Sequence, residues 1–324
     1  MPSPRFRFGI SFPNFSLDAA AKIARDVERA RLDSVWVNDD LVGVFQRETQ
    51  DPILCMAEMA KATYRVRIGS AVLATYRRHP ANTAQSIISL DHISGGRLIA
   101  GVGSCCPSIE WGFPAQGGVA ERFFEFMTVL KKLLSGGSVE FQGRFFNIRT
   151  SGFEAKPKQK PHPPIWAAAN IDRVIRGIAS VADGWLPICV SPQIYSSELE
   201  ILHEAAESAG RKPRDIEAGC MLFTVVEKKR ESAVRKAMPL LAQTVLWFNA
   251  ARVRKMGFKA VTSANDVTPE MVLALNIVGS IEDAAQRIGE YLDIGAKHLV
   301  LQPLPLKEIR VAIPRIAEAI RQAA

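Results

Sequence analysis

The sequence predicts an α/β fold of the (β/α)8 barrel class, and three observations carry the prediction. Short β-rich runs alternate with longer segments of helical period along the whole chain, which is the pattern of parallel βαβ units. Eight such pairs can be assigned, the number that closes a barrel, and 324 residues suffice for it. The rival fold is a doubly wound sheet, but that fold often has a Gly-rich first turn, and residues 12–16 contain no glycine.

The first four strand–helix pairs follow one another regularly. The predicted strands are short runs dominated by apolar residues, at 5–12, 34–37, 66–73 and 97–103. The predicted helices carry apolar residues at helical spacing, at 17–31, 52–63, 80–93 and 119–134. Pro52 suits a first helical turn, and Gly95 with Gly96 ends the third helix.

The second half repeats the pattern with two interruptions. The predicted strands are 164–169, 184–188, 216–226 and 298–304, and the predicted helices are 171–181, 192–209, 231–248, 281–294 and 306–323. A small hairpin is expected at 139–148, around Gln142-Gly143, directly after the fourth helix. Residues 252–274 look irregular, so we expect an insertion over about 249–278, before strand 8, in a single domain spanning 1–324.

Composition excludes several classes of protein. The chain is 48% hydrophobic and 23% charged, which argues against a disordered chain, a collagen or a coiled coil. No apolar run reaches the roughly 18 residues of a membrane span, and the first residues lack the apolar core of a signal peptide. The five cysteines have no metal-type spacing, which favours reduced thiols and a cytoplasmic location. The net charge of +8 is spread along the chain, so no nucleic-acid partner is expected.

The barrel class itself selects candidate site residues, because chemistry in such barrels lies at the carboxyl ends of the strands. These ends fall at 11–14, 38–40, 70–79, 103–110, 168–173, 187–190, 224–227 and 302–305. Asp39 and Asp40 end the second strand, where two adjacent carboxylates can bind a metal, act as acid and base, or shift each other's pKa. The alternative is structural: Asp40 caps a turn and Asp39 bonds nearby backbone.

The end of the fourth strand offers a second set of candidates. Gly103 and Ser104 close a Gly-x-Gly-Ser run, whose small residues would let a flat ring lie against the barrel mouth. Cys106 follows, and as a nucleophile it would need a base such as His79. The alternative is a buried, apolar thiol. Glu110 is a further candidate for polar contact with a bound ring or substrate.

The end of the fifth strand runs straight into a helix. Ala168, Ala169, Asn170 and Ile171 are mostly small, which lets backbone N–H groups approach an anion at the helix start. This favours a phosphate site, with a plain strand-to-helix turn as the alternative. The five histidines show neither HxH nor HExxH spacing, so no catalytic metal is expected.

Several stretches taken together resemble the bacterial-luciferase-like superfamily, including its branch that depends on the deazaflavin coenzyme F420. The run 91–103, DHISGGRLIAGVG, is similar to the family's D-x-[LI]-S-x-G-R…G-V-G segment. The segments 68–73 with 78–81, PPIW at 163–166 with ADGW at 182–185, and GSIED at 279–283 with GAKHLVL at 295–301 match other family patterns. The resemblance covers nearly the whole chain in the right order.

This resemblance implies a barrel that binds F420 or FMN at the strand ends, commonly as a cytoplasmic homodimer. In the F420 branch a non-prolyl cis peptide at the end of strand 3 forms a bulge behind the ring, and the matching bond here joins Ala71 and Val72. Ser11, on strand 1, and the loop from Ala168 to Ile171 match places that contact the cofactor, the loop through its phosphate.

Departures from the family narrow the expected chemistry. The family often has Asp-His where this chain has Asp39-Asp40, an acid in some members where Ser11 or Cys106 stands, and a glycine where Ile171 stands. With fewer acid–base groups, hydride reduction of an electrophilic C=N or C=C bond, as in methylenetetrahydromethanopterin reductase, is favoured over alcohol oxidation, which needs a base.

Three functions remain open at this point. The favoured one is an oxidoreductase that transfers a hydride between F420 and a small organic substrate. The second is an FMN-dependent luciferase-like monooxygenase, and the third is a non-catalytic paralogue that binds a cofactor, suggested by Ser11, Asp40 and Cys106. Both cofactors are anionic, which agrees with the positive charge of the chain.

Overall fold

The computed structural model describes residues 6–13, 16–41, 49–104 and 118–324. Within them, parallel strands close a barrel in the order β10, β12, β1, β2, β3 with β4, β5, β8, β9 and back to β10. The strands are β1 (Arg7–Phe12), β2 (Ser34–Val37), β3 (Arg67–Ser70), β4 (Leu73–Ala74), β5 (Leu98–Gly103), β8 (Ile165–Ala168), β9 (Gly184–Trp185), β10 (Glu217–Val226) and β12 (His298–Pro303). The predicted (β/α)8 barrel is confirmed.

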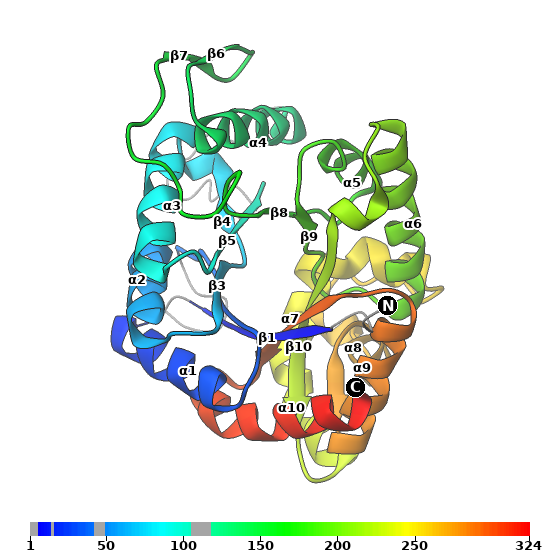
Figure 1. Ribbon diagram of the computed structural model, residues 1–324. Helices are drawn as coiled ribbons and strands as arrows, with labels where there is room; N and C mark the ends of the chain where they lie inside the picture. The colour runs from blue at the N-terminus through cyan, green and yellow to red at the C-terminus, as the bar shows by residue number, and fades with distance from the viewer. Residues whose placement is uncertain (1–5, 14–15, 42–48, 105–117) are drawn as a thin grey trace.

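Helices surround the strands, as Figure 1 shows. They are α1 (Leu17–Arg29), α2 (Pro52–Ala62), α3 (Pro80–Ser94), α4 (Val119–Ser135), α5 (Asp172–Ile178), α6 (Pro192–Ser208), α7 (Arg230–Lys255), α8 (Pro269–Leu275), α9 (Ile281–Asp293) and α10 (Ile309–Ala323). Local signals fix many of their ends: the Ser16 hydroxyl caps α1, Pro52 opens α2, and Gly95, at φ 70°, ends α3.

The predicted hairpin is confirmed. Strands β6 (Val139–Gln142) and β7 (Asn147–Thr150) pair antiparallel, and in Figure 1 they project beyond α4 at the top of the molecule. The Glu125 carboxylate of α4 accepts backbone N–H groups of the turn at Arg144 and Phe145, which ties the hairpin to the helix.

The expectation of an irregular insertion at 249–278 was wrong in its secondary structure. Helix α7 continues to Lys255 and ends before Gly257, at φ 83°, a 3-10 turn forms at Ala264–Asp266, and α8 follows. Strand β11 (Ile277–Gly279) then pairs parallel with the carboxyl end of β10. The helix-start signal was present in the sequence: the Thr268 hydroxyl caps α8, and Pro269 occupies its first turn.

The predicted third strand is split at the point where the resemblance placed a bulge. The Ala71–Val72 peptide bond is cis, as expected, and it separates β3 from β4. Two glycines of β5 leave the space that this bulge fills. A Cβ on Gly101 would overlap the Ser70 carbonyl oxygen, and one on Gly103 would lie against the Val72 side chain.

The barrel interior holds an apolar layer that is separate from the larger core under the helices. Its fully buried members are Trp36, Ile99, Trp166, Leu186, Met221 and Val300. The rings of Trp36 and Trp166 lie with their centroids 5.3 Å apart. Ala71, Val72 and Ile188 are only partly buried and pack against this layer, so they form the boundary between the filled interior and the carboxyl rim.

A polar plug of four residues fills the amino end of the barrel: Arg7, Ser34, Glu217 and His298. The Glu217 carboxylate accepts from Arg7 at 2.7 Å and lies 3.2 Å from His298 Nδ1. His298 Nε2 lies 2.7 Å from the Ser34 hydroxyl oxygen, which also accepts from the Trp36 indole at 2.7 Å. Each group therefore has a partner at the start of another strand, and the plug closes this end.

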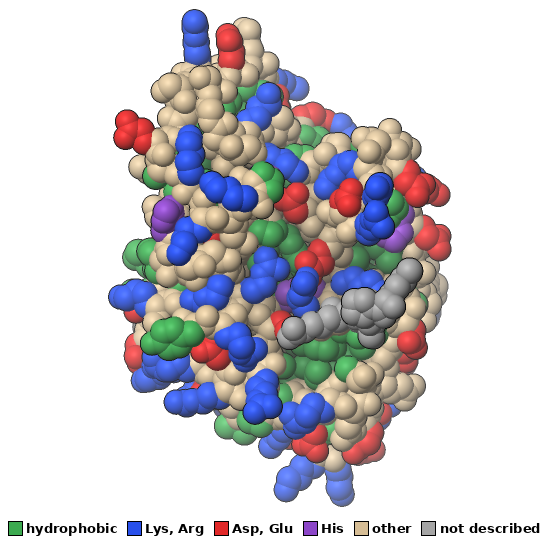
Figure 2. Space-filling view, in the orientation of Figure 1, with side chains coloured by type: hydrophobic (Ala, Val, Ile, Leu, Met, Phe, Trp, Pro, Cys, Tyr) green, Lys and Arg blue, Asp and Glu red, His purple; other side chains and the backbone are tan. Residues whose placement is uncertain are grey.

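On the face of the molecule in Figure 2, the positive charge is dispersed rather than concentrated. On the face in Figure 2, Lys and Arg side chains are scattered over the left and lower parts, with Asp and Glu among them. No helix in the described part of the chain is long and apolar enough to cross a membrane.

Candidate functional site at the carboxyl rim

Polar side chains from three strands meet at the carboxyl rim. Ser11 belongs to β1, Asn38 directly follows β2, and Gln302 belongs to β12. The Ser11 hydroxyl donates to Asn38 Oδ1 at 2.9 Å, and Asn38 Nδ2 donates to Gln302 Oε1 at 3.3 Å. The Asn38 side chain also acts to lower the pKa of the Asp40 carboxyl, two residues along the chain. We call these four residues, Ser11, Asn38, Asp40 and Gln302, the rim network.

Asp40 is the titratable member of this network. Its side chain is half-buried. Burial, reinforced by the negative charge of Asp39, raises the pKa of Asp40 to about 6, while the hydrogen bond from Asn38 and the charge of Arg77 act in the opposite direction. A carboxyl with this pKa exchanges a proton near neutral pH, as a general acid or base must.

Asp39 faces a different set of partners. One carboxylate oxygen lies 2.7 Å from Arg77, and the other accepts from the Ala74 backbone N–H at 2.9 Å and from Arg78 at 3.2 Å. Both oxygens are thus occupied by the end of β4 and the segment that follows it. This geometry makes Asp39 an anchor for that segment, although the sequence analysis placed both aspartates among the catalytic candidates.

The bulge supplies a small apolar floor beside the network. Ala71 and Val72 are partly exposed above the apolar layer, and Gly103 lies next to Val72 at the end of β5. Ser104 follows, half-buried. These residues are brought together as the sequence analysis expected. Cys106 and Glu110 lie outside the described residues.

The predicted phosphate loop lies at the end of β8, and part of it is already engaged within the protein. Ala169 is buried, and its carbonyl accepts from the Trp185 indole at 2.9 Å. Asn170 Oδ1 accepts from the Ile188 backbone N–H at 3.2 Å. Ile171 is 65% exposed and directly precedes α5, whose first residue is acidic. The backbone N–H groups of this loop and the Asn170 side-chain NH2 are the donors that an anion could meet.

A buried arginine that the sequence analysis did not select supports this loop. Arg252 of α7 donates to the Ile188 carbonyl at 2.6 Å, to Asn170 at 3.4 Å and to the Glu198 carboxylate at 2.7 Å. It comes from the region expected to be an irregular insertion, so no sequence signal placed it near strand ends. Asn38 and Gln302 were missed as well, although their positions at strand ends were available as a signal.

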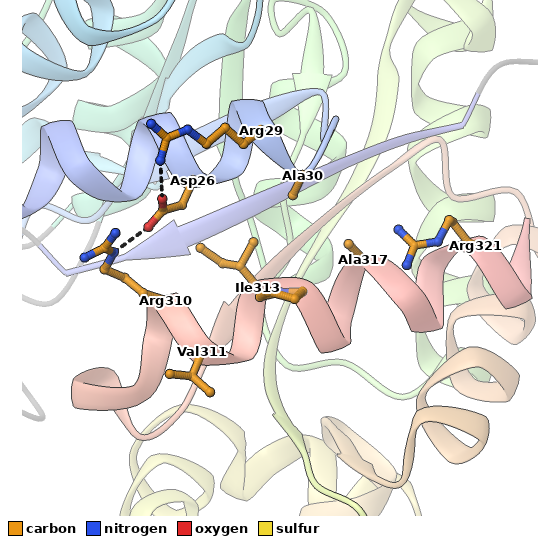
Figure 3. A pocket seen from close by; sticks show the side chains of 9 residues that line it. Asp26, Arg29, Ala30, Arg310, Val311, Ile313, Ala317 and Arg321 are labelled. Atoms are coloured by element: carbon orange, nitrogen blue, oxygen red, sulfur yellow. Dashed lines mark hydrogen bonds and ion pairs between the residues drawn. The ribbon is translucent and has the colours of Figure 1, made fainter.

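Two other features of the structure lack what a site at the strand ends needs. Ser34, His298 and Glu217 are spaced like a Ser–His–acid triad, but Ser34 and His298 are fully buried at the amino end, where no substrate reaches them. A cavity of about 600 Å³ lies between α1 and α10 (Figure 3), where Asp26 pairs with Arg29 and Arg310. No strand end lines it, so it is not the candidate site.

The described residues also contain no cluster of three or more His, Cys, Asp or Glu side chains that could hold a metal ion. The candidate site therefore consists of the rim network, the apolar floor and the loop at the end of β8. This arrangement suits a flat molecule that lies on the floor with its polar edge near the network and an anionic tail near the loop.

Comparison with known proteins places this chain among relatives of matching length. It is 26% identical over 321 residues to the phthiodiolone/phenolphthiodiolone dimycocerosates ketoreductase of Mycobacterium kansasii, covering 83% of this chain and 86% of that protein. It is also 26% identical over 314 residues to the 5,10-methylenetetrahydromethanopterin reductase of Methanolobus tindarius, covering 90% and 93%.

Solved structures share the fold. The coenzyme F420-dependent tetrahydromethanopterin reductase from Methanopyrus kandleri superposes with a TM-score of 0.88 at 21% identity, covering 99% of this chain and 100% of that one. A type II Baeyer–Villiger monooxygenase of Pseudomonas putida in complex with FMN gives 0.77 at 17% identity, covering 98% and 97%. The family model for luciferase-like monooxygenases matches residues 4–298, and the chain therefore belongs to the luciferase-like monooxygenase family.

Proposed function

We propose that this protein is an oxidoreductase that transfers a hydride between coenzyme F420 and a small organic substrate, with reduction of a C=N or C=C bond as the favoured reaction. The observation that carries the proposal is the half-buried carboxyl of Asp40 beside the apolar floor of Ala71 and Val72, at the carboxyl rim of a luciferase-like barrel. The names of two relatives support a reductase, but only the methylenetetrahydromethanopterin reductase agrees with the favoured bond, since a ketoreductase acts on a ketone C=O.

The residues at the rim fit such a cofactor. A planar ring needs a flat apolar surface, which Ala71 and Val72 offer, and Gly103 carries no side chain that would displace Val72 from this floor. The buried Gln302 amide has an Nε2 without a partner in the described protein, which leaves a donor in the rim network. Backbone N–H groups after Ala168 would face the phosphate.

When bound, F420 supplies the hydride, and the protein's share is positioning and proton handling. Reduction of a C=N bond adds the hydride to carbon and a proton to nitrogen. Asp40, with a pKa of about 6, would hold that proton at its carboxyl oxygen. Asp39 would keep the segment after β4 in place through its contacts with Ala74 and Arg77.

An FMN-dependent monooxygenase is the second candidate, favoured by the FMN-bound neighbour of the same fold. A non-catalytic, cofactor-binding paralogue is the third. For each of these functions we predict a single-domain protein that forms a homodimer in the cytoplasm. Sedimentation of the purified protein would test the dimer, and the protein's location in fractionated cells would test the cytoplasmic assignment.

The decisive experiment is a titration of the purified protein with F420 and, separately, with FMN, followed by absorbance. Reduced F420 is then mixed with a cyclic imine, an enone and a ketone. We expect F420 binding, faster oxidation of reduced F420 by the imine or enone than by the ketone, and at least tenfold slower turnover in Asp40→Asn. Tight FMN binding with oxygen-dependent turnover would replace this proposal with the monooxygenase. Binding of neither cofactor would contradict both.

A further inference from the structure

The side-chain amide of Asn170 is held by two groups that can only donate hydrogen bonds. Its Oδ1 accepts from the Ile188 backbone N–H at 3.2 Å and from the Arg252 guanidinium at 3.4 Å. Reversal of the amide would turn its NH2 group against both donors and leave them without an acceptor. The oxygen of this amide therefore faces Ile188 and Arg252, and its orientation is fixed by its partners.

The Asn170 NH2 group consequently points away from these donors. Asn170 lies two residues beyond the end of β8 and is half-buried. Its Nδ2 donates to no described residue, and it is not one of the buried polar atoms that lack a partner, so it is open to solvent. Two N–H donors at the carboxyl rim are thus available to an acceptor on a ligand.

Arg252 joins three parts of the chain behind this amide. Besides Asn170, it donates to the Ile188 carbonyl at 2.6 Å and to the Glu198 carboxylate of α6 at 2.7 Å. Ile188 follows β9, and its side chain packs against the apolar layer that underlies the apolar floor. One arginine of α7 therefore sets the place of the Asn170 amide relative to the floor at the rim.

The ion pair of Arg252 and Glu198 points to placement rather than to stability. Their side chains are 5% and 2% exposed, and Arg252 Nε and Glu198 Oε1 have no partner among the described residues. A buried ion pair with unsatisfied atoms contributes less to stability than well-packed apolar side chains of similar size. Apolar side chains, however, could not hold Asn170 and Ile188 together through a planar fork of donors.

We propose that Arg252 is a positioning residue, which fixes Asn170 so that its NH2 group donates to the phosphate of a bound cofactor and gives the site its preference for phosphorylated ligands. This inference rests on the proposed function, which places the phosphate of the cofactor at the loop after β8. The guanidinium is buried and already engaged, so it acts through Asn170 and not by contact with the phosphate. Lys255, further along α7, pairs with Asp172 and offsets the acidic start of α5.

The test compares a ligand that carries the phosphate with one that lacks it. Dissociation constants are measured for FMN and riboflavin, and for F420 and its deazaflavin core without phosphate and tail. The ratio within each pair is the phosphate preference. We expect Arg252→Met to lower this preference about tenfold, the effect of losing one hydrogen bond to a charged group, and to change the affinity for the phosphate-free ligand by less than about twofold.

Two further variants keep the test valid if Arg252→Met fails to fold. Arg252→Met combined with Glu198→Leu removes both buried charges, so no unpaired carboxylate remains, and it should lower the phosphate preference equally. Asn170→Asp keeps an oxygen for Ile188 and Arg252 but replaces the NH2 group by a negatively charged oxygen. This variant should abolish the preference, whereas a purely structural role of Asn170 predicts little change.

Arg97→Met is the matched control. Arg97 also donates to backbone carbonyls, those of Ala60 and Val66 among them, but it directly precedes β5 at the amino end of the barrel. Its loss should lower thermal stability and leave the phosphate preference unchanged.

An equal loss of affinity for both members of a pair in the Arg252 variants, or an unchanged preference in Asn170→Asp, would overturn the inference. Failure of F420 alone to bind the wild type would contradict the proposed function, and the FMN pair would then decide the inference. A wild type that binds both members of a pair equally would overturn the inference alone, and one that binds neither cofactor would overturn both.

Discussion

The two ends of the same barrel treat polar side chains in opposite ways. At the amino end, Arg7, Ser34, Glu217 and His298 satisfy one another and seal the interior. At the carboxyl rim, Gln302 keeps a donor that has no partner among the described residues, and Asp40 is half-buried with a raised pKa. The strands are shared, so this difference separates what holds the barrel together from what is left available for a ligand.

The pKa values make this comparison quantitative. At the amino end, burial alone would raise the pKa of Glu217, but hydrogen bonds and charges from His298 and Arg7 outweigh it and lower the pKa to about 2. Burial lowers the pKa of His298, against the opposing effect of Glu217. At the rim the balance is reversed, and the ionised form of Asp40 is disfavoured. The plug therefore stabilises its charged carboxylate, and the rim does not.

The largest change in stability is expected from a substitution that disturbs the backbone at the rim. Gly101→Ala places a Cβ on the Ser70 carbonyl oxygen, which can move only if the bulge moves, so we expect a loss of about 3 kcal/mol in unfolding free energy, the upper end of the usual range for overpacking. Denaturant unfolding measures it. Gly289→Ala in α9 is the control, because no atom lies within 4 Å of the added Cβ, and it should gain about 0.5–1 kcal/mol. Equal effects of the two changes would show that the bulge is not tightly packed.

The next effect tests the plug. Glu217→Gln removes a carboxylate whose pKa is about 2 in the folded protein against an ordinary 4.5, so at pH 7 it should cost about 3 kcal/mol. In the wild type this contribution is present above pH 4.5 and is lost as the pH falls toward 2, and the variant should lack that loss. Thermal melts across this range measure it. Unchanged affinity for F420 is the expected control result, since the plug lies at the opposite end from the rim.

Asp40→Asn should change stability in the opposite direction. The folded pKa of Asp40 is raised above its unfolded value, so the wild type loses stability as the pH rises from about 4 to about 6. The variant should avoid this loss and be more stable at pH 7 by about 2 kcal/mol. Melts at pH 4 and pH 7 measure the difference. A variant less stable than the wild type at pH 7 would mean that Asp40 belongs with the satisfied carboxylates of the plug.

The smallest change in stability is expected at Ser34, and it tests whether the triad-like arrangement of Ser34, His298 and Glu217 has a chemical role. Ser34→Ala leaves the Trp36 indole and His298 Nε2 without their shared partner, which should cost about 1–2 kcal/mol. Hydrolysis of an activated ester, such as p-nitrophenyl acetate, should be the same in variant and wild type. A drop in ester hydrolysis would instead give the amino end a chemical role.

Much of the fold could be predicted from the sequence because its signals are local. The strand at Ser34–Val37 was predicted to the residue, and the caps at Pro52 and Gly95 marked helix ends correctly. Residues 249–278 were predicted poorly, because the helix-start signal at Thr268-Pro269 was overlooked and the apolar strand after it, Ile277–Gly279, is very short.

The site was less predictable, because its contacts join distant parts of the chain. Position at a strand end brought out Asp40 but could not tell it from Asp39, whose partners Arg77 and Arg78 depend on how the segment after β4 folds back. Gln302 is 264 residues from Asn38, and only barrel closure brings their amides together. The cis bond at Ala71–Val72 was predicted from the family resemblance, because no local sequence pattern indicates it.

The pair of indoles in the interior has a practical consequence. Trp36 and Trp166 lie in the layer on which Ala71 and Val72 pack, so a chromophore resting on that floor would be separated from them by little more than the bulge. Deazaflavins and flavins absorb where tryptophan emits. Loss of intrinsic emission on mixing would thus report occupancy of the rim without any label, and a silent signal would mean that the chromophore binds elsewhere.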